Sequence, residues 1–203
     1  MLMLGRFRRW FFAKCLLPGA SARHELLVAA QKRKLFAGLR PSDTVVELGP
    51  GTGPNFTYFP AGVRWIGVEP NPHLEHGLRK AGHSEIHTGI ATVPSGIADV
   101  VVCTLVLCSV HDVAAILAEV RRVLKPGGVF YFLEHVAAPE GSGRRRTQRR
   151  VRGVWRWFGN GCDLCREPAM ELLRAGFLDV QVEAFEVAEL GPAAPHIVGT
   201  ARN

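Results

Sequence analysis

Short runs of apolar and β-branched residues alternate along the chain with segments whose apolar positions recur at helical spacing. The apolar runs predict strands at residues 44–48, 63–69, 85–88, 98–107, 129–134, 178–185 and 196–202. Strands separated by helical segments are typical of a parallel sheet, and the last two runs predict an antiparallel pair at its edge. The sequence therefore predicts a doubly wound α/β fold whose sheet is mostly parallel.

The run at 98–107, ADVVVCTLVL, is apolar at almost every position. A strand that is buried on both faces has this composition. We therefore expect this run to form the central strand of the sheet.

Helix signals lie between the apolar runs. Helical periodicity covers residues 24–37 and 112–124, and a further helix is expected at 167–175. Prolines in Gly53-Pro54 and Asn71-Pro72 mark the starts of a short helix and a longer one. The sequence KPGG at 125–128 predicts a turn after the helix at 112–124.

A basic amphipathic helix is predicted to begin after Gly143. One face would carry Val151, Val154, Trp155 and Phe158, and another would carry Arg145, Arg149, Arg152 and Arg156. Such stripes are typical of a helix at a membrane or domain surface. The alternative is a nucleic-acid surface on which arginines hold phosphates and Trp155 and Trp157 stack on bases.

Composition limits the organisation of the chain. Its 203 residues, 47% of them hydrophobic, suit one globular domain, which we place at 41–203. Residues 1–40 form an arm that mixes aromatic and basic residues and has no acidic residue before Glu25. The arm has three interpretations: an interfacial membrane anchor, an organellar presequence or a helix packed on the domain. The net charge of +7 suits a nucleic acid, an anionic membrane or an anionic substrate as partner.

The five cysteines are an odd number, and Cys103 and Cys108 lie in an apolar segment as small core residues would. This pattern argues against a disulfide framework and favours a reducing, intracellular compartment. Cys162 and Cys165 have C-x-x-C spacing, but a structural zinc site needs four ligands and the sequence has no second pair of this kind. No metal site is predicted.

The first predicted strand runs into VVELGPGTG, residues 45–53, with glycine at every second position from 49. This is not the G-x-G-x-x-G spacing of dinucleotide sites, and no lysine follows Gly53 as a triphosphate-binding loop requires. Glu47 suits a ligand with an ammonium or sulfonium group, and Glu69, after the second predicted strand, is placed for a ribose diol. S-adenosylmethionine has both features and no phosphate, so it is the predicted cofactor.

These motifs, together with RRVLKPGG before the fifth strand, resemble the class I S-adenosylmethionine-dependent methyltransferases over residues 44–133. VVCTLVLCSV at 101–110, LKPGGVFYFLEHVAAP at 124–139 and PHIVG at 195–199 resemble the small methyltransferase-like group that includes thiol S-methyltransferases. The resemblance implies a seven-stranded Rossmann-like methyltransferase fold and a small-molecule methyl acceptor, with a thiol among the candidates. It also implies peripheral contact with the endoplasmic-reticulum membrane, with the cytoplasm and the mitochondrion as alternatives.

The expected cofactor-binding residues lie at the carboxyl ends of the strands, around the switch point of the sheet. They are Glu47, Gly49, Gly51, Gly53, Asn55, Glu69, Pro70, Ala91, Thr92, Thr104 and Leu105.

Methyl transfer to a thiol or hydroxyl needs a group that favours the anion of the acceptor. His135, at the end of the fifth predicted strand, is the first candidate, and His111 is the second, with helix capping by His111-Asp112 as the alternative. Candidates for the acceptor pocket are Trp155, Phe158 and Cys162. Two other functions stay open: an RNA-modifying or RNA-binding protein that uses the arginine-rich helix, and a pseudoenzyme without turnover.

Overall fold

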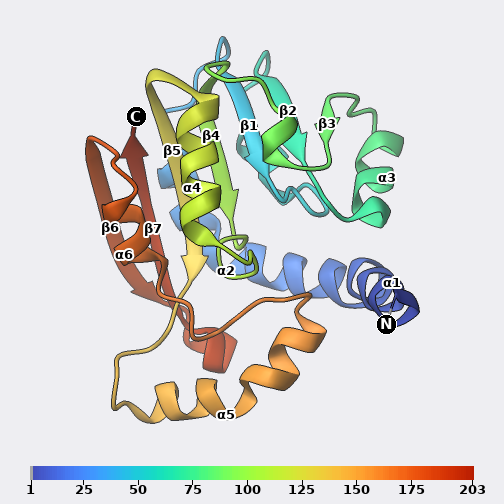
Figure 1. Ribbon diagram of the computed structural model, residues 1–203, viewed down its shortest axis with the longest axis vertical. Helices are drawn as coiled ribbons and strands as arrows, with labels where there is room; N and C mark the ends of the chain where they lie inside the picture. The colour runs from blue at the N-terminus through green and yellow to red at the C-terminus, as the bar shows by residue number, and fades with distance from the viewer. Residues whose placement is uncertain (1) are drawn as a thin grey trace.

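The computed structural model describes residues 2–203, with side chains from residue 5 onward, as a seven-stranded sheet with helices on both faces (Figure 1). The strands are β1 (Thr44–Leu48), β2 (Arg64–Val68), β3 (Ile86–His87), β4 (Ala98–Thr104), β5 (Leu124–His135), β6 (Asp179–Glu186) and β7 (Pro195–Arg202). Their order across the sheet is β3-β2-β1-β4-β5-β7-β6. β1 to β5 are parallel, and β7 runs antiparallel to β5 and β6. The predicted α/β fold and its antiparallel edge are confirmed, and β4 is the central strand.

The helical elements follow the predicted order. They are α1 (Leu2–Phe11), a π-helical turn η1 (Phe12–Leu16), α2 (Leu17–Phe36), η2 (Pro54–Tyr58), α3 (Pro72–Lys80), η3 (Ile90–Thr92), α4 (Val113–Val123), α5 (Gly143–Phe158), α6 (Pro168–Arg174) and η4 (Ala188–Ala193). α1, η1 and α2 follow one another directly, so the arm and the helix predicted at 24–37 form one helical stretch.

Each face of the sheet has its own hydrophobic core. On one face, Leu117 and Val120 of α4 and Leu172 of α6 are buried against the strands. On the other face, α2 contributes Val28 and Phe36, which are buried with residues of β1, β4 and β5. Helices on both faces of the central parallel strands explain why those strands are apolar throughout.

The KPGG sequence does not form the predicted turn outside the strand. It lies within β5, where Ala98 pairs with Leu124 but Val100 pairs with Val129, so the extra residues form an irregularity in the ladder. Gly127 has a φ of +75°, a left-handed conformation that favours glycine. The prediction was wrong here because a glycine-rich bulge and a glycine-rich turn have the same sequence signal.

The helix predicted after Gly143 is present as α5. Val154 and Phe158 of its predicted apolar stripe are 65% and 45% exposed, whereas Arg145 and Gln148 are buried. Gln148 accepts a hydrogen bond from the backbone N–H of Ala138 at 2.8 Å and donates to the carbonyls of Val136 at 3.2 Å and Pro192 at 2.8 Å. Buried backbone groups need hydrogen-bond partners, and Gln148 supplies them to three backbone groups of the adjoining loops. This explains why a polar face of α5 is turned inward.

The carboxyl ends of β1, β4 and β5 open toward one end of the sheet, and α5 and the N-terminal helices lie at that end (Figure 1). Among the helices that the structure describes, none combines the length and the hydropathy needed to cross a bilayer.

Candidate active site

The glycine-rich loop leaves the end of β1 with Gly49, Gly51 and Gly53 at φ angles of +57°, +60° and +82°. These left-handed conformations are costly for residues with a Cβ atom. A Cβ atom at Gly49 would also lie 2.6 Å from the Val106 side chain, in the loop after β4. Glycine is needed at these positions for their left-handed backbone conformation. At Gly49 it also allows the loop after β1 to approach the loop after β4.

Glu69 stands at the end of β2 beside this loop and is 4% exposed. Its carboxylate accepts hydrogen bonds from the backbone N–H of Gly51 at 3.2 Å and of Asn71 at 2.8 Å. Burial raises the pKa of Glu69, and these two hydrogen bonds oppose the rise. The donors of the loop thus face a carboxylate, which suits a ligand without phosphate. The neighbouring Pro70 is exposed.

Glu47, at the end of β1 before the loop, is buried with 1% of its surface exposed. Its carboxylate accepts from Asn55 Nδ2 at 2.7 Å and from Trp65 Nε1 at 2.8 Å. Burial raises the pKa of Glu47 to about 7 against the effect of these hydrogen bonds. These hydrogen bonds tie Glu47 to η2 and β2 beneath the glycine loop.

Asn55 connects the glycine loop to the central strand. Its Nδ2 also donates to Thr104 Oγ1, 3.0 Å away at the end of β4, and its buried Oδ1 has no partner among the residues described. Leu105 follows with a φ of +58°, which ends β4 three residues before the predicted boundary. Ala91 and Thr92 are exposed in η3, beyond β3.

The N-terminal helices cover the glycine loop. Leu17 of α2 lies near Gly51, 3.4 Å from the position that a Cβ atom would take. The Ser21 and Thr52 hydroxyls are 3.5 Å apart, and Asn71 Nδ2 donates to the Arg9 carbonyl at 3.2 Å. Residues of the arm therefore contribute to the surroundings of the predicted cofactor site.

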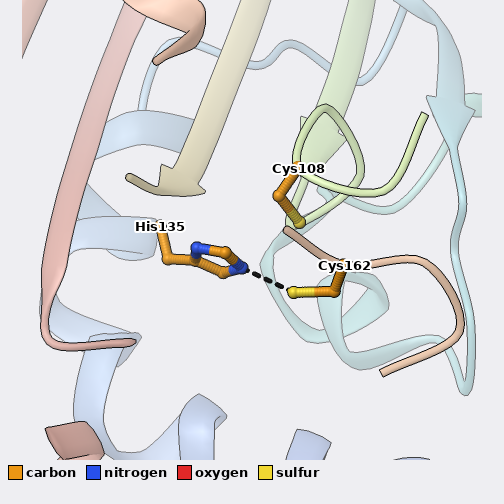
Figure 2. Close-up of side chains that lie close together, drawn as sticks. All are labelled: Cys108, His135 and Cys162. Atoms are coloured by element: carbon orange, nitrogen blue, oxygen red, sulfur yellow. Dashed lines mark hydrogen bonds between the residues drawn. The ribbon is translucent and has the colours of Figure 1, made fainter. Parts of the chain in front are cut away.

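A second cluster lies beyond the ends of β4 and β5, where Cys108, His135 and Cys162 point toward one another (Figure 2). His135 Nε2 is 2.8 Å from Cys162 Sγ, and Trp155 Nε1 donates to the same sulfur at 3.2 Å. One ligand atom from each of the three residues lies within 4.8 Å of the others. Cys108 and His135 are buried, and Cys162 is partly buried.

The cluster favours charge separation between His135 and Cys162. The neighbouring Cys108 thiol lowers the pKa of Cys162 to about 5, with His135 and Trp155 adding to the effect and burial opposing it. The neighbouring Cys162, together with burial, raises the pKa of Cys108. Burial alone would lower the pKa of His135, but the hydrogen bond and charge of Cys162 raise it. Both shifts favour transfer of the shared proton from Cys162 to His135.

Two networks hold these side chains in place. The carboxylate of the fully buried Glu134 accepts from the backbone N–H of Val106 and of Leu107, each at 2.9 Å, which fixes the loop that carries Cys108. The N–H of Asp163 donates to the Cys108 carbonyl at 2.9 Å. Arg152 on α5 in turn donates to both carboxylate oxygens of Asp163 at 2.6–3.0 Å.

The structure brings three of the predicted acceptor-side residues together, namely His135, Trp155 and Cys162. His111 is exposed and lies outside the cluster, while Asp112 caps α4 by accepting from the Ala115 N–H at 3.0 Å. Phe158 also lies outside it and packs against Trp157.

Sequence patterns did not identify Cys108, Glu134 or Asp163 as site residues. Cys108 was taken for a small core residue, and its burial agrees with that interpretation. One sequence feature indicates Glu134, because this acidic residue directly precedes the candidate base His135 at the end of a predicted strand.

The chain is similar to known methyltransferases over most of its length. A family model described as a methyltransferase domain matches residues 21–179. The thiol S-methyltransferase TMT1B of Rattus norvegicus is 37% identical over 207 residues, which cover 92% of this chain and 84% of that protein. The thiol S-methyltransferase TMT1B of Homo sapiens is 40% identical over 190 residues, covering 85% of this chain and 78% of that protein.

Solved structures agree in fold. A SAM-dependent methyltransferase from Thermotoga maritima aligns with a TM-score of 0.65 at 20% identity, covering 95% of this chain and 99% of that one. A geranyl diphosphate methyltransferase in complex with SAM aligns with a TM-score of 0.64 at 18% identity, covering 85% and 84% of the two chains.

Proposed function

Because the chain belongs to the methyltransferase-domain family of S-adenosylmethionine-dependent enzymes, we propose that it methylates the sulfur of a small-molecule thiol. The observation that carries the choice of acceptor is the polar cluster of Cys108, His135 and Cys162, buried at the strand ends beside the glycine loop. The similarity to thiol S-methyltransferases supports the same choice.

The cofactor would lie along the glycine loop at the ends of β1 and β2. Glu69 is the candidate for the ribose hydroxyls, since a strand-end carboxylate of this kind accepts hydrogen bonds from a diol. Thr104 and Leu105 would border the methionine part, and Ala91 and Thr92 the adenine. When bound, S-adenosylmethionine supplies a methyl group on a positively charged sulfur, a leaving group that needs no protonation.

What the chain must then provide is orientation and a place for one proton. Displacement at carbon is in line, so holding the acceptor sulfur opposite the leaving sulfur supplies much of the rate. The thiolate is the reacting form of a thiol, so the acceptor proton must leave. As the new sulfur–carbon bond forms and the sulfonium–carbon bond breaks, the products are a methyl thioether and a neutral thioether.

The His135–Cys162 pair can take that proton. When the pair is an imidazolium and a thiolate, Cys162 Sγ can accept the proton of the acceptor thiol. When both members are neutral, His135 Nε2 can accept it. Either form offers one acceptor to a thiol that enters the cluster. Trp155, which donates to Cys162 Sγ, steadies the pair and adds an apolar wall for the acceptor.

The arginine-rich helix supports a small-molecule acceptor over RNA. Several of its arginines lie in ion pairs, Arg144 with Glu186, Arg145 with Glu167, Arg149 with Glu140 and Arg152 with Asp163, at 2.6–3.1 Å. Charges paired within the protein are less available to phosphates. Among the exposed aromatics of α5, Trp157 packs edge-on against Phe158 and does not present an open stacking face on that side.

A labelled-methyl transfer assay tests the proposal with small thiols, phenols, amines and RNA as acceptors. We expect label to pass to thiols, and His135→Gln to lower kcat by about 100-fold because proton transfer by a positioned side chain contributes at least that much. His111→Gln is the matched control, since His111 lies outside the cluster, and it should retain the wild-type rate. Transfer to RNA alone, or cofactor binding with no transfer to any thiol, would contradict the proposal.

A further inference from the structure

We propose that Cys108, His135 and Cys162 bind one Zn²⁺ ion, at a site with three protein ligands and one open position (Figure 2). Among the residues that the structure describes, this is the one group of three cysteine, histidine or acidic side chains whose ligand atoms converge in this way. The three come from separate parts of the fold: the loop after β4, the end of β5 and the loop after α5.

The ligand types and their spacing suit zinc. Two thiolates and one imidazole form a mixed sulfur and nitrogen set that Zn²⁺ prefers over the oxygen ligands of magnesium or calcium. Zinc binds sulfur at about 2.3 Å and nitrogen at about 2.0–2.1 Å, which places ligand atoms about 3.5–3.8 Å apart. The three atoms here lie within 4.8 Å of one another, so side-chain rotations of small size can bring them to one ion.

The two cysteines already have supporting contacts of the kind found at metal sites. Sulfur ligands commonly accept hydrogen bonds from nearby N–H groups, and Cys162 Sγ accepts one from Trp155 at 3.2 Å. Glu134 fixes the backbone before Cys108, and the Asp163–Arg152 pair fixes the residue after Cys162. A site whose ligands are held before the ion arrives loses less conformational entropy on binding.

The hydrogen bond of 2.8 Å between His135 Nε2 and Cys162 Sγ occupies the same lone pairs that a metal would use. Zn²⁺ would replace the shared proton, so binding releases protons to the solvent and no oxidant or reductant is involved. Cys165, which completes the C-x-x-C spacing in the sequence, is outside this set of ligands.

The open fourth position gives the ion a role, and this step rests on the proposed function. Catalytic zinc sites have three protein ligands and one exchangeable position, whereas structural zinc sites have four protein ligands. A thiol that takes the fourth position binds as its thiolate and gives its proton to the solvent. In this form His135 is a ligand, and the cation takes over from the His135–Cys162 pair the task of favouring the acceptor anion.

Metal titration of the full chain tests the site without requiring turnover. The protein is kept reduced with a phosphine, stripped of metal by a chelator, and titrated with Zn²⁺ in competition with a chromophoric chelator. We expect one equivalent to bind, and Co²⁺ in its place to show the absorption of a tetrahedral thiolate complex. Cys108→Ser, His135→Gln and Cys162→Ser should each weaken binding by about 100-fold or more, while Cys165→Ser should bind as the wild type does.

Circular dichroism and the thermal midpoint establish that each variant is folded, and a Zn²⁺-dependent rise of the midpoint in wild type but not in Cys162→Ser is a second readout. Failure of wild type to bind one equivalent, or equal loss of binding in Cys165→Ser, would overturn the metal site. Zinc binding with no methylation of any thiol would instead overturn the proposed function and leave the metal site intact. Equal methylation rates with and without Zn²⁺ would overturn the role of the open position.

Discussion

The two sides of the site are assembled from the chain in different ways. The cofactor side is formed largely by one stretch, residues 45–71, in which β1, the glycine loop and β2 follow each other directly. The acceptor side takes Cys108, His135 and Cys162 from three segments that only the fold brings together (Figure 2). Local backbone conformation therefore determines the cofactor side, and packing between distant segments determines the acceptor side.

Both sides nevertheless use a buried carboxylate to hold a loop at a strand end. Glu69 accepts the N–H groups of Gly51 and Asn71, and Glu134 accepts those of Val106 and Leu107. Glu134 holds the loop that carries Cys108, whereas Glu69 lies against the glycine loop of the predicted cofactor site. We therefore expect Glu134 to contribute mainly to stability and acceptor geometry, and Glu69 mainly to binding.

The largest effect is expected from Glu134→Ala. Two well-formed hydrogen bonds are lost, a cavity is created and buried N–H groups are left without partners, at a cost of about 3–5 kcal/mol in the free energy of unfolding. Glu134→Gln should cost only about 1 kcal/mol, because both short bonds go to one oxygen that an amide can supply. Urea unfolding monitored by circular dichroism measures both variants.

The matched control for this prediction is Glu140→Ala. Glu140 is exposed, its partner Arg149 is exposed, and its buried partner Arg145 keeps an ion pair with Glu167, so its loss should change stability by about 0.5 kcal/mol or less. Equal destabilisation by Glu134→Ala and Glu140→Ala would mean that the loop after β4 does not depend on the Glu134 carboxylate.

A smaller and different effect is expected from Glu69→Ala. Loss of charge-assisted hydrogen bonds to the ribose should weaken S-adenosylmethionine binding by about 100-fold, which isothermal titration calorimetry measures. Glu183→Ala, on β6 where this exposed side chain pairs with Lys34, is the control that should bind normally. An unchanged dissociation constant in Glu69→Ala would remove this residue from the cofactor site.

The contrast between the two sides also explains what could be predicted from the sequence. Gly49, Gly51 and Gly53 need left-handed conformations, and that need is visible in the residue type itself. Strand periodicity located β1, β2 and β4, and the strand-end rule then placed Glu69 beside the loop. Glu47 was placed on the correct strand, but its hydrogen bonds to Asn55 and Trp65 involve side-chain directions that spacing does not reveal.

The acceptor side was predicted only in part. His135 was identified because it ends a strand, but Cys108 and Cys162 are 54 positions apart and are joined by folding alone. Of the pair Cys162 and Cys165, which C-x-x-C spacing brings together in the sequence, only Cys162 joins the cluster. The contacts of α5 could not be predicted for a related reason, since Gln148 bonds to three loop backbones that no helical pattern encodes.

Buried titratable groups extend the comparison to pH. His24 on α2 lies 3.1 Å from His196 on β7, and His196 donates to the Ala194 carbonyl. Burial lowers the pKa of His24 to about 3, with His196 adding to the effect, and burial lowers the pKa of His196 to about 4. In the unfolded chain both histidines bind protons as pH falls below their ordinary pKa of about 6.5, whereas in the folded chain they stay neutral. The free energy of unfolding therefore decreases as pH falls from about 6.5 toward 3.

Glu47 on the cofactor side has the opposite sign. Its folded pKa of about 7 lies above the ordinary 4.5, so its contribution to stability is full below 4.5 and is lost as pH rises through 7. Between pH 7 and pH 5, His24→Gln should therefore flatten the acid loss of stability, and Glu47→Gln should steepen it. Each change should be on the order of 1–2 kcal/mol, measured by urea unfolding across that range. Parallel pH profiles for the two variants would show that the two groups do not keep opposite protonation preferences in the folded chain.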